Sequence, residues 1–258
     1  MGQAVPEALR RFELTGRVAI VTGASSGLGE GLARVLASAG ARVAVVARRY
    51  DRLGELATEI GGLAIGCDLL DAAQVSEIVP KAAAELGSPE ILVNAAGSIL
   101  AFESAEHEPL EAIRKTLDLN LVAPFLLCQA VFPHMAAARR GSIVNVSSIS
   151  GRVGVPGVPQ ASYAASKLGL SGLTAELAVQ WAHHSIRVNT LAPGFFRSEI
   201  TNALYDDERS RRWLHRNTPL PGDGTVNDFV GAVLWLVSDA GRYVTGQTIV
   251  VDGGWTAR

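Results

Sequence analysis

The sequence predicts an α/β fold in which a doubly wound parallel sheet has helices on both faces. Seven short runs rich in β-branched residues alternate with longer segments that have helical spacing. The runs are apolar almost throughout, which is typical of parallel strands covered on both faces. They comprise residues 18–21, 43–46, 63–67, 91–94, 143–146, 188–191 and 248–251.

The segment between the first two runs shows how the strands are connected. Leu28, Leu32, Val35 and Leu36 lie at i, i+4, i+7 and i+8 and so share one helix face, and Gly40 follows as a helix stop. This is a βαβ unit. Its repetition predicts a doubly wound sheet whose ligands bind at the carboxyl ends of the strands.

Length and composition favour one domain over residues 1–258. Glycine and proline together contribute 27 + 11 = 38 of 258 residues, which is too few for a low-complexity chain. The 23 basic and 25 acidic residues leave a net charge of -2, so we expect neither nucleic acid nor a membrane surface as partner. Cys67 and Cys128 lie in apolar runs, and residues 1–10 lack a signal layout. We therefore expect a cytoplasmic protein.

One segment interrupts the alternation of strands and helices. Residues 195–216, here called the lid, combine aromatic residues such as Phe195, Tyr205 and Trp213 with dense charge. The length of this segment between the last two strands favours a substrate-binding excursion, with a surface helix pair as the alternative.

A glycine-rich turn, residues 22–29, follows the first strand and leads directly into the first helix. Glycines allow close backbone approach, and a helix N-terminus attracts phosphate. The same stretch also reads as G-x-S-x-G, the nucleophile elbow of α/β-hydrolases, with Ser25 as nucleophile. Such an elbow needs several strands before it. Only one fits here, so the phosphate interpretation is favoured.

A tyrosine and a lysine occupy one face of a predicted helix. Tyr163 and Lys167 are spaced i, i+4, and a nearby cation favours the phenolate that a general acid/base requires. Ser147 and Ser148 follow the preceding strand, so the hydroxyls and the amine should meet at the carboxyl edge of the sheet.

Together these motifs resemble the short-chain dehydrogenase/reductase family, in the branch of oxoacyl-carrier-protein reductases and hydroxysteroid dehydrogenases. The resemblance covers nearly the whole chain. It implies a single-domain Rossmann fold with a seven-stranded sheet and a ketone or secondary alcohol as substrate. It is carried by Thr22-Gly23-x-x-x-Gly27-x-Gly29, Cys67-Asp68-Leu69, Asn94-Ala95-Ala96-Gly97, Asn120, Ser148, Tyr163-x-x-x-Lys167, Pro193-Gly194 and Val244-Thr245-Gly246-x-x-x-x-Val251-Asp252-Gly253-Gly254.

The resemblance also implies roles for individual residues. Tyr163 would exchange a proton with the carbonyl oxygen, Ser148 would position that oxygen, and Lys167 would hold the nicotinamide ribose and lower the tyrosine pKa. Asn120 would anchor a proton-relaying water chain. The dinucleotide would contact Gly23, Ser25, Ser26, Gly27, Leu28, Arg48, Arg49, Asp68, Leu69, Asn94, Ala95, Gly97, Tyr163, Lys167, Pro193, Gly194, Phe196 and Ser198.

The sequence departs from the family pattern at two places. Ala95 replaces the second asparagine of the usual Asn-Asn-Ala-Gly motif. Two extra positions separate Ser148 from Tyr163, in the Gly- and Pro-rich stretch 151–159 that should border the substrate.

The end of the second strand predicts the cofactor. Enzymes that use NAD place an acid there, whereas this chain has Ala47 followed by Arg48 and Arg49. Guanidinium groups bind a 2′-phosphate by charge-assisted bonds, which predicts NADP(H) over NAD(H), with Arg48 as main contact and Ser25 assisting. The alternative is that Arg48 and Arg49 are solvated residues at the start of a surface helix. Asp51 should cap a helix beginning near Arg52.

The aromatic lid favours an apolar ketone or alcohol, with two enzyme alternatives. A 3-oxoacyl-thioester reductase would need a basic landing patch, for which Arg139 and Arg140 are candidates, and gluconate-type dehydrogenases resemble residues 217–220. A third alternative, which is not an enzyme, is a dinucleotide-binding sensor on the same fold. The resemblance implies a homotetramer, with apolar contacts from Leu121, Val122, Phe125, Leu126 and Trp255. We expect no metal.

Overall fold

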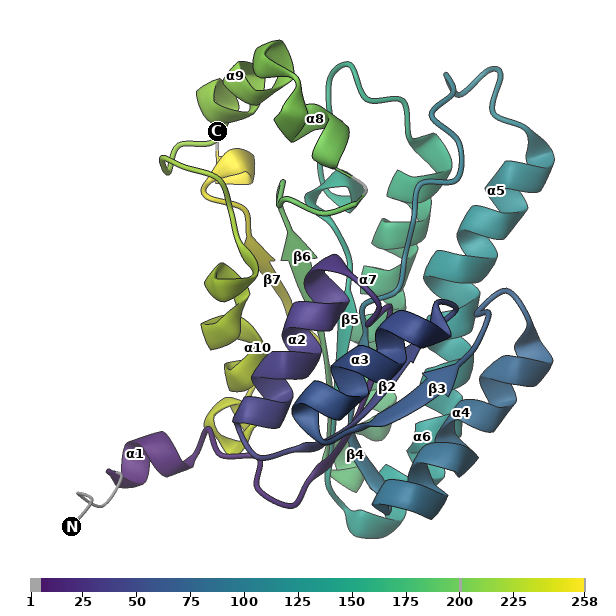
Figure 1. Cartoon of the computed structure of the whole chain (residues 1–258), viewed down its shortest axis with the longest axis vertical. Coiled ribbons are helices and arrows are strands. Elements are labelled where there is room, and N and C mark those ends of the chain that lie inside the picture. The colour runs from purple at the N-terminus through teal and green to yellow at the C-terminus, as the bar shows by residue number, and fades with distance from the viewer. Residues whose placement is uncertain (1–5, 200, 258) are drawn as a thin grey trace.

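The computed structural model describes residues 6–199 and 201–257, and its centre is one parallel sheet (Figure 1). The strand order is β3-β2-β1-β4-β5-β6-β7, and every pairing is parallel. All seven predicted runs are strands, most of them one to four residues longer than predicted. The strands are β1 Val18–Thr22, β2 Arg42–Ala47, β3 Leu63–Gly66, β4 Pro89–Asn94, β5 Gly141–Val146, β6 Ile186–Pro193 and β7 Thr248–Val251.

Helices cover both faces of the sheet, as predicted (Figure 1). α2 (Gly27–Ser38), α3 (Tyr50–Ile60) and α10 (Val230–Val237) pack on one face. α4 (Ala72–Leu86), α6 (Ala123–Ala138) and α7 (Ala161–Trp181) pack on the other. Strand residues alternate between the two layers: Ala19 and Val21 belong to the first core, and Ile20 to the second.

The order of the strands determines where a ligand can bind. The chain leaves β1 toward β2 and β3 on one side, then returns to place β4 on the other side of β1. In such sheets the connections on either side of the reversal diverge and leave a crevice at the carboxyl ends of the strands. The lid lies beyond this edge as α8 (Asn202–Asp206) and α9 (Glu208–Asn217), so it contains the helix pair of the alternative interpretation (Figure 1).

The end of α2 agrees with the sequence prediction, and the start of α3 does not. α2 ends at Ser38, and Gly40 follows with φ of 97°, as predicted. The prediction for Asp51 was wrong, because α3 begins at Tyr50 with Arg49 at the N-cap position. Asp51 therefore lies in the first helical turn, where its charge favours the helix dipole.

One long helix is apolar over much of its length. α5 (Leu110–Leu117), a π-helical turn (Asp118–Val122) and α6 form a continuous helix over Leu110–Ala138, with mean hydropathy of 1.6 over its best window. Length and composition alone would allow it to cross a membrane. However, Leu127, Val131 and Met135 are buried in the core against the sheet, as expected of a core helix.

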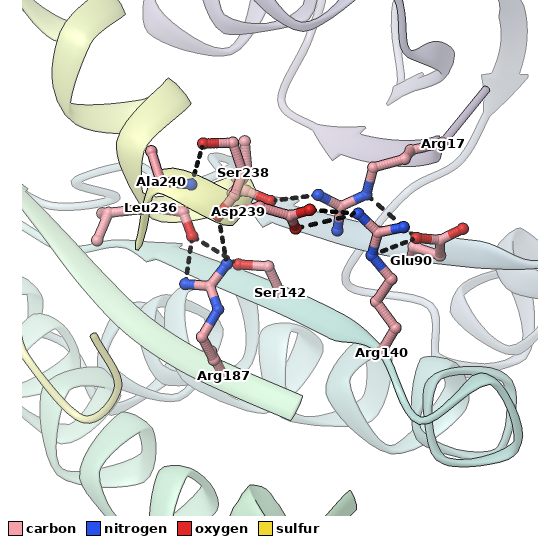
Figure 2. A network of polar contacts seen from close by, with 10 residues as sticks. Arg17, Glu90, Arg140, Ser142, Arg187, Leu236, Ser238, Asp239 and Ala240 are labelled. Atoms are coloured by element: carbon pink, nitrogen blue, oxygen red, sulfur yellow. Dashed lines mark hydrogen bonds and ion pairs between the residues drawn. The ribbon is translucent and has the colours of Figure 1, made fainter. Parts of the chain in front are cut away.

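An arginine network closes the opposite, amino-terminal edge of the sheet (Figure 2). Arg17 Nη1 donates to the Val237 carbonyl at 2.8 Å, and Arg187 Nη1 to the Leu236 carbonyl at 2.6 Å. These are carbonyls that the end of α10 leaves without helical partners. Glu90 pairs with Arg17 at 3.1 Å. Burial lowers the pKa of Arg17 and brings that of Arg187 to about 10.

Candidate active site

A cavity of about 480 Å³ lies at the carboxyl edge of the sheet. This volume is within the range of small-molecule and cofactor sites. Its walls come from the glycine-rich turn, the β2–α3 connection, the segments following β3, β4, β5 and β6, and the first turns of α7. The cavity therefore occupies the crevice that the strand order predicts.

The glycine-rich turn is shaped by close backbone contacts. A Cβ atom on Gly23 would lie 2.7 Å from the Ala96 Cα atom, and one on Gly29 would lie 2.4 Å from the Gly23 carbonyl oxygen. Gly23 and Gly27 also have positive φ values of 68° and 58°. The turn thus brings bare backbone to the start of α2, an arrangement suited to a phosphate group.

Arg49, rather than Arg48, holds the hydroxyls of this turn. Its Nε and Nη2 atoms donate to Ser25 Oγ at 3.1 and 3.0 Å, and Nη2 also donates to Ser26 Oγ at 2.7 Å. Arg48 borders the cavity from the neighbouring position. Both arginines thus border the cavity, and the role of Arg48 as main contact of a 2′-phosphate stays a prediction.

Tyr163, Ser148 and Lys167 lie together in the wall of the cavity. Tyr163 lies in the first turn of α7, and Ser148 follows β5. Lys167 Nζ donates to the Val146 carbonyl at 2.8 Å and lies 5.7 Å from the centroid of the Tyr163 ring.

The electrostatics of this group differ from the expectation that Lys167 lowers the tyrosine pKa. Burial raises the Tyr163 pKa above its ordinary value, and a hydrogen bond with Ser148 opposes that shift. Burial likewise lowers the Lys167 pKa to about 8, since the charged amine loses hydration. The site thus holds a neutral phenol beside a lysine that gives up its proton readily.

Asn120 connects the loop after β4 to the helix layer. It lies in the π-helical turn, where its Oδ1 accepts from the Ser98 amide at 3.0 Å. Its Nδ2 donates to the Ser98 carbonyl at 3.0 Å and to Ser166 Oγ at 3.1 Å. A Cβ atom on Gly97 would lie 2.7 Å from Lys167 Nζ and 3.1 Å from Asn120 Oδ1. Only glycine at position 97 leaves both side chains where they are.

Apart from two asparagines, the predicted site residues all line the cavity. Asn120 acts behind the wall through Ser98. Asn94 does not reach the cavity, because its side chain is 1% exposed and its Nδ2 donates to Asn145 Oδ1 at 2.8 Å within the core. Its side chain therefore does not line the cavity, and its ribose contact stays a prediction.

The sequence interpretation missed two carboxylates, Glu199 in the cavity lining and Glu108 behind it. Glu108 accepts hydrogen bonds from the Ser162 amide at 3.2 Å and from the Ser162 hydroxyl, and so caps the helix that carries Tyr163. Glu199 reaches from the lid to the glycine-rich turn. Neither belongs to a local motif. Each contacts a partner at least 54 positions away, and no short spacing could have shown it.

Comparison with known proteins agrees with this geometry. A family model described as Enoyl-(Acyl carrier protein) reductase matches residues 23–256. The chain is 36% identical over 252 residues to D-threitol dehydrogenase from Mycolicibacterium smegmatis, covering 96% of this chain and 95% of that protein.

Two solved structures give the same result. A short-chain type dehydrogenase/reductase from Mycobacterium marinum matches with a TM-score of 0.92 and 36% identity, over 98% of this chain and 100% of that one. A gluconate 5-dehydrogenase from Burkholderia cenocepacia, in complex with NADP and tartrate, matches with a TM-score of 0.92 and 35% identity at the same coverage. The chain therefore belongs to the short-chain dehydrogenase/reductase family of oxidoreductases.

Proposed function

We propose that this protein is an NADP(H)-dependent oxidoreductase that interconverts a ketone and a secondary alcohol, with Tyr163 as general acid and base. The observation that carries the proposal is that Tyr163, Ser148 and Lys167 lie together in the wall of a cavity that the glycine-rich turn also lines. A proton donor and a phosphate cradle thus share one cavity.

Each residue of the catalytic group has a distinct task in this proposal. Tyr163 donates its hydroxyl proton to the carbonyl oxygen during reduction and removes the alcohol proton during oxidation. Ser148 donates a hydrogen bond to the same oxygen. Lys167, anchored on Val146, places positive charge beside the phenol when it is protonated. Asn120 keeps the loop after β4 against Lys167, and so acts as a positioning residue.

The residues around the glycine-rich turn fit a dinucleotide with a 2′-phosphate. Gly23 and Gly27 allow close backbone approach, and Arg48 and Arg49 directly follow Ala47, the position where an NAD enzyme has an acid. Asp68 and Leu69 border the adenine end, and Pro193, Gly194, Phe196 and Ser198 the other end. NADP(H) bound there would supply or accept the hydride. The gluconate 5-dehydrogenase neighbour, solved with NADP, supports the assignment.

The substrate end of the cavity favours an uncharged apolar ketone or alcohol. It is lined by Ile99, Leu100, Phe102, Ile149, Val158, Phe195 and Leu204, together with the polar residues Ser150 and Gln160. Among the described lining residues, the cations are Arg48, Arg49 and Lys167, which are assigned to the cofactor and to the phenol. A sugar acid would lack a partner for its carboxylate, which counts against a gluconate-type substrate.

The positions of Arg139 and Arg140 in a single chain give less support to an acyl-carrier-protein substrate. Arg139 donates to the His183 carbonyl at 2.8 Å, and Arg140 pairs with Asp239 at 3.0 Å. Both follow α6 and precede β5, at the edge of the sheet opposite the cavity. The basic patch that such a partner would need is therefore remote from the catalytic group.

We further propose a cytoplasmic homotetramer. The outer faces of the π-helical turn, α6 and α7 expose Val122 (44%), Phe125 (40%) and Leu168 (58%), an apolar surface suited to a second copy of the chain. Trp255 is not part of this exposed surface, because it is 5% exposed and its ring centroid lies 4.8 Å from that of Phe195. Both cysteines are buried and free, as suits a reducing compartment.

The proposal is tested by following NADPH oxidation at 340 nm over a panel of aryl, cyclic and steroid ketones, a β-ketoester, an acyl thioester and a keto-sugar acid, with NADH in parallel. We expect turnover of uncharged ketones with NADPH and a lower kcat/KM with NADH. Preference for the keto-sugar acid would contradict the substrate assignment, and preference for NADH would contradict the cofactor. Light scattering that shows a monomer would contradict the assembly.

A further inference from the structure

Glu199 joins the lid to the glycine-rich turn and to the β2–α3 connection, both of which line the cavity. Its Oε1 accepts from Arg49 Nη1 at 2.8 Å and from Arg52 Nη1 at 2.7 Å. Its Oε2 accepts from Ser26 Oγ at 3.1 Å. The contacted residues lie 147 to 173 positions earlier in the chain, so one side chain joins the lid, the glycine-rich turn and the start of α3.

Contacts with the rest of the fold hold the residues just before Glu199. Phe196 is 7% exposed and packs with its ring centroid 4.2 Å from that of Phe229. The Ser198 amide donates to Thr201 Oγ1 at 3.0 Å. A Cβ atom on Gly27 would lie 3.5 Å from Ser198 Cβ, so the lid rests directly on the glycine-rich turn. The position of the carboxylate thus follows from its anchored neighbours.

Arg49 is shared between the carboxylate and the serines. Nη1 bonds Glu199, and Nε and Nη2 bond Ser25 and Ser26. These serines and this arginine surround the position where a residue after the second strand meets the ribose 2′ substituent. A phosphate bound at that position needs the same donors that the carboxylate now uses.

Charge determines which anion binds better. The hydrogen bond from Arg49 lowers the Glu199 pKa to about 2, so the carboxylate is ionised throughout the neutral range and carries one negative charge. A phosphate monoester carries about -1.5 to -2 at pH 7 and has three acceptor oxygens. It therefore forms stronger charge-assisted bonds with Arg49 and can displace the carboxylate.

We propose that Glu199 is a specificity-determining residue, whose carboxylate occupies the place of the cofactor's 2′-phosphate and competes with it for Arg49 and Ser26. A ligand with this phosphate releases the Glu199 side chain from the turn, whereas a ligand without it leaves the contact intact. The inference rests on the proposed use of NADP(H).

The experiment measures calorimetric binding of 2′,5′-ADP and 5′-AMP, which differ in the 2′-phosphate and lack nicotinamide. The proteins are the wild type, Glu199→Gln and the control Glu59→Gln. Glu59 accepts from Arg34 Nε at 2.7 Å, and its side chain is 53% exposed, compared with 48% for Glu199. The control therefore removes an equally exposed paired carboxylate on α3, outside the residues that line the cavity.

We expect Glu199→Gln to bind 2′,5′-ADP roughly three- to tenfold more tightly than the wild type, since exposed ion pairs are weak individually. Its affinity for 5′-AMP should stay within about twofold, and Glu59→Gln should match the wild type with both ligands. Unchanged or weaker binding of 2′,5′-ADP by Glu199→Gln overturns the inference, as does equal strengthening with both ligands.

The two proposals fail in distinguishable ways. If the wild type prefers 2′,5′-ADP but Glu199→Gln is unchanged, only the role of Glu199 is wrong. If neither protein prefers 2′,5′-ADP over 5′-AMP, the NADP(H) assignment is wrong and the inference falls with it.

Discussion

The Lys167 amine lies 5.7 Å from the centroid of the Tyr163 ring and donates to the Val146 carbonyl at 2.8 Å. A titratable amine is thereby fixed to the end of β5 directly beside the phenol. Because both groups are buried, their pKa values move apart: that of Tyr163 rises and that of Lys167 falls to about 8. The pH dependence of this pair leads to two predictions.

The first concerns the direction of the reaction. With its pKa raised, Tyr163 is protonated at neutral pH and ready to act as an acid. We expect kcat/KM for ketone reduction to be level near pH 7, and kcat/KM for alcohol oxidation to rise with pH into the alkaline range. An oxidation profile already level below pH 7 would contradict this account.

The second concerns stability. The folded-state pKa of Lys167 is about 8, below the ordinary value of 10.5, so between these values the unfolded chain binds more protons. The contribution of Lys167 to the free energy of unfolding should therefore rise by roughly 1–3 kcal/mol from pH 7.5 to 10. Urea unfolding at a series of pH values measures it. The free energy of unfolding of the wild type minus that of Lys167→Met should rise with pH. A difference independent of pH would mean that the pKa is not lowered.

Gly97 should be intolerant of a methyl group. Its Cβ atom would lie 2.7 Å from Lys167 Nζ, so Gly97→Ala must displace the amine or the loop. We expect kcat to fall by about 10²-fold or more, with a loss of about 1–3 kcal/mol in unfolding free energy. The control is Gly54→Ala in α3, where nothing lies within 4 Å of the added atom. It should leave kcat unchanged and stabilise by about 0.5–1 kcal/mol. Full activity of Gly97→Ala would contradict the assigned position of Lys167.

The arginine network at the opposite edge should contribute to stability without affecting catalysis. Arg17→Met removes a buried bond to the Val237 carbonyl and an ion pair with Glu90, so we expect a loss of about 1.5–3 kcal/mol in urea unfolding. Arg34→Met breaks pairs with Glu30 and Glu59 whose side chains are at least 32% exposed, and should lose about 1 kcal/mol or less. Equal losses for the two variants would show that burial is not the deciding factor.

The sequence predicts the sheet and the catalytic group because both depend on local patterns. Strands buried on both faces are apolar runs. Tyr163 and Lys167 are one helical turn apart, and Ser148 follows a strand at the same edge. Chain order and the geometry of parallel sheets are then sufficient to place these residues together.

The parts that sequence could not predict depend on long-range contacts and on burial. Asn94 belongs to a family motif, and its side chain bonds Asn145 on the neighbouring strand within the core. Arg48 and Arg49 are indistinguishable in sequence, and only the start of α3 at Tyr50 turns Arg49 toward the serines. The upward shift of the Tyr163 pKa follows from the amount of protein around the phenol, which a motif does not encode.

The central claim, that Tyr163 is the proton donor and acceptor, is tested most directly by Tyr163→Phe. The measurement is kcat for NADPH-dependent reduction of the preferred ketone, with NADPH binding followed by fluorescence in the same preparations. We expect kcat to fall by about 10²- to 10⁴-fold, the range of general acid catalysis, while the dissociation constant for NADPH changes by less than about threefold. Retention of wild-type turnover by Tyr163→Phe would contradict the proposed mechanism.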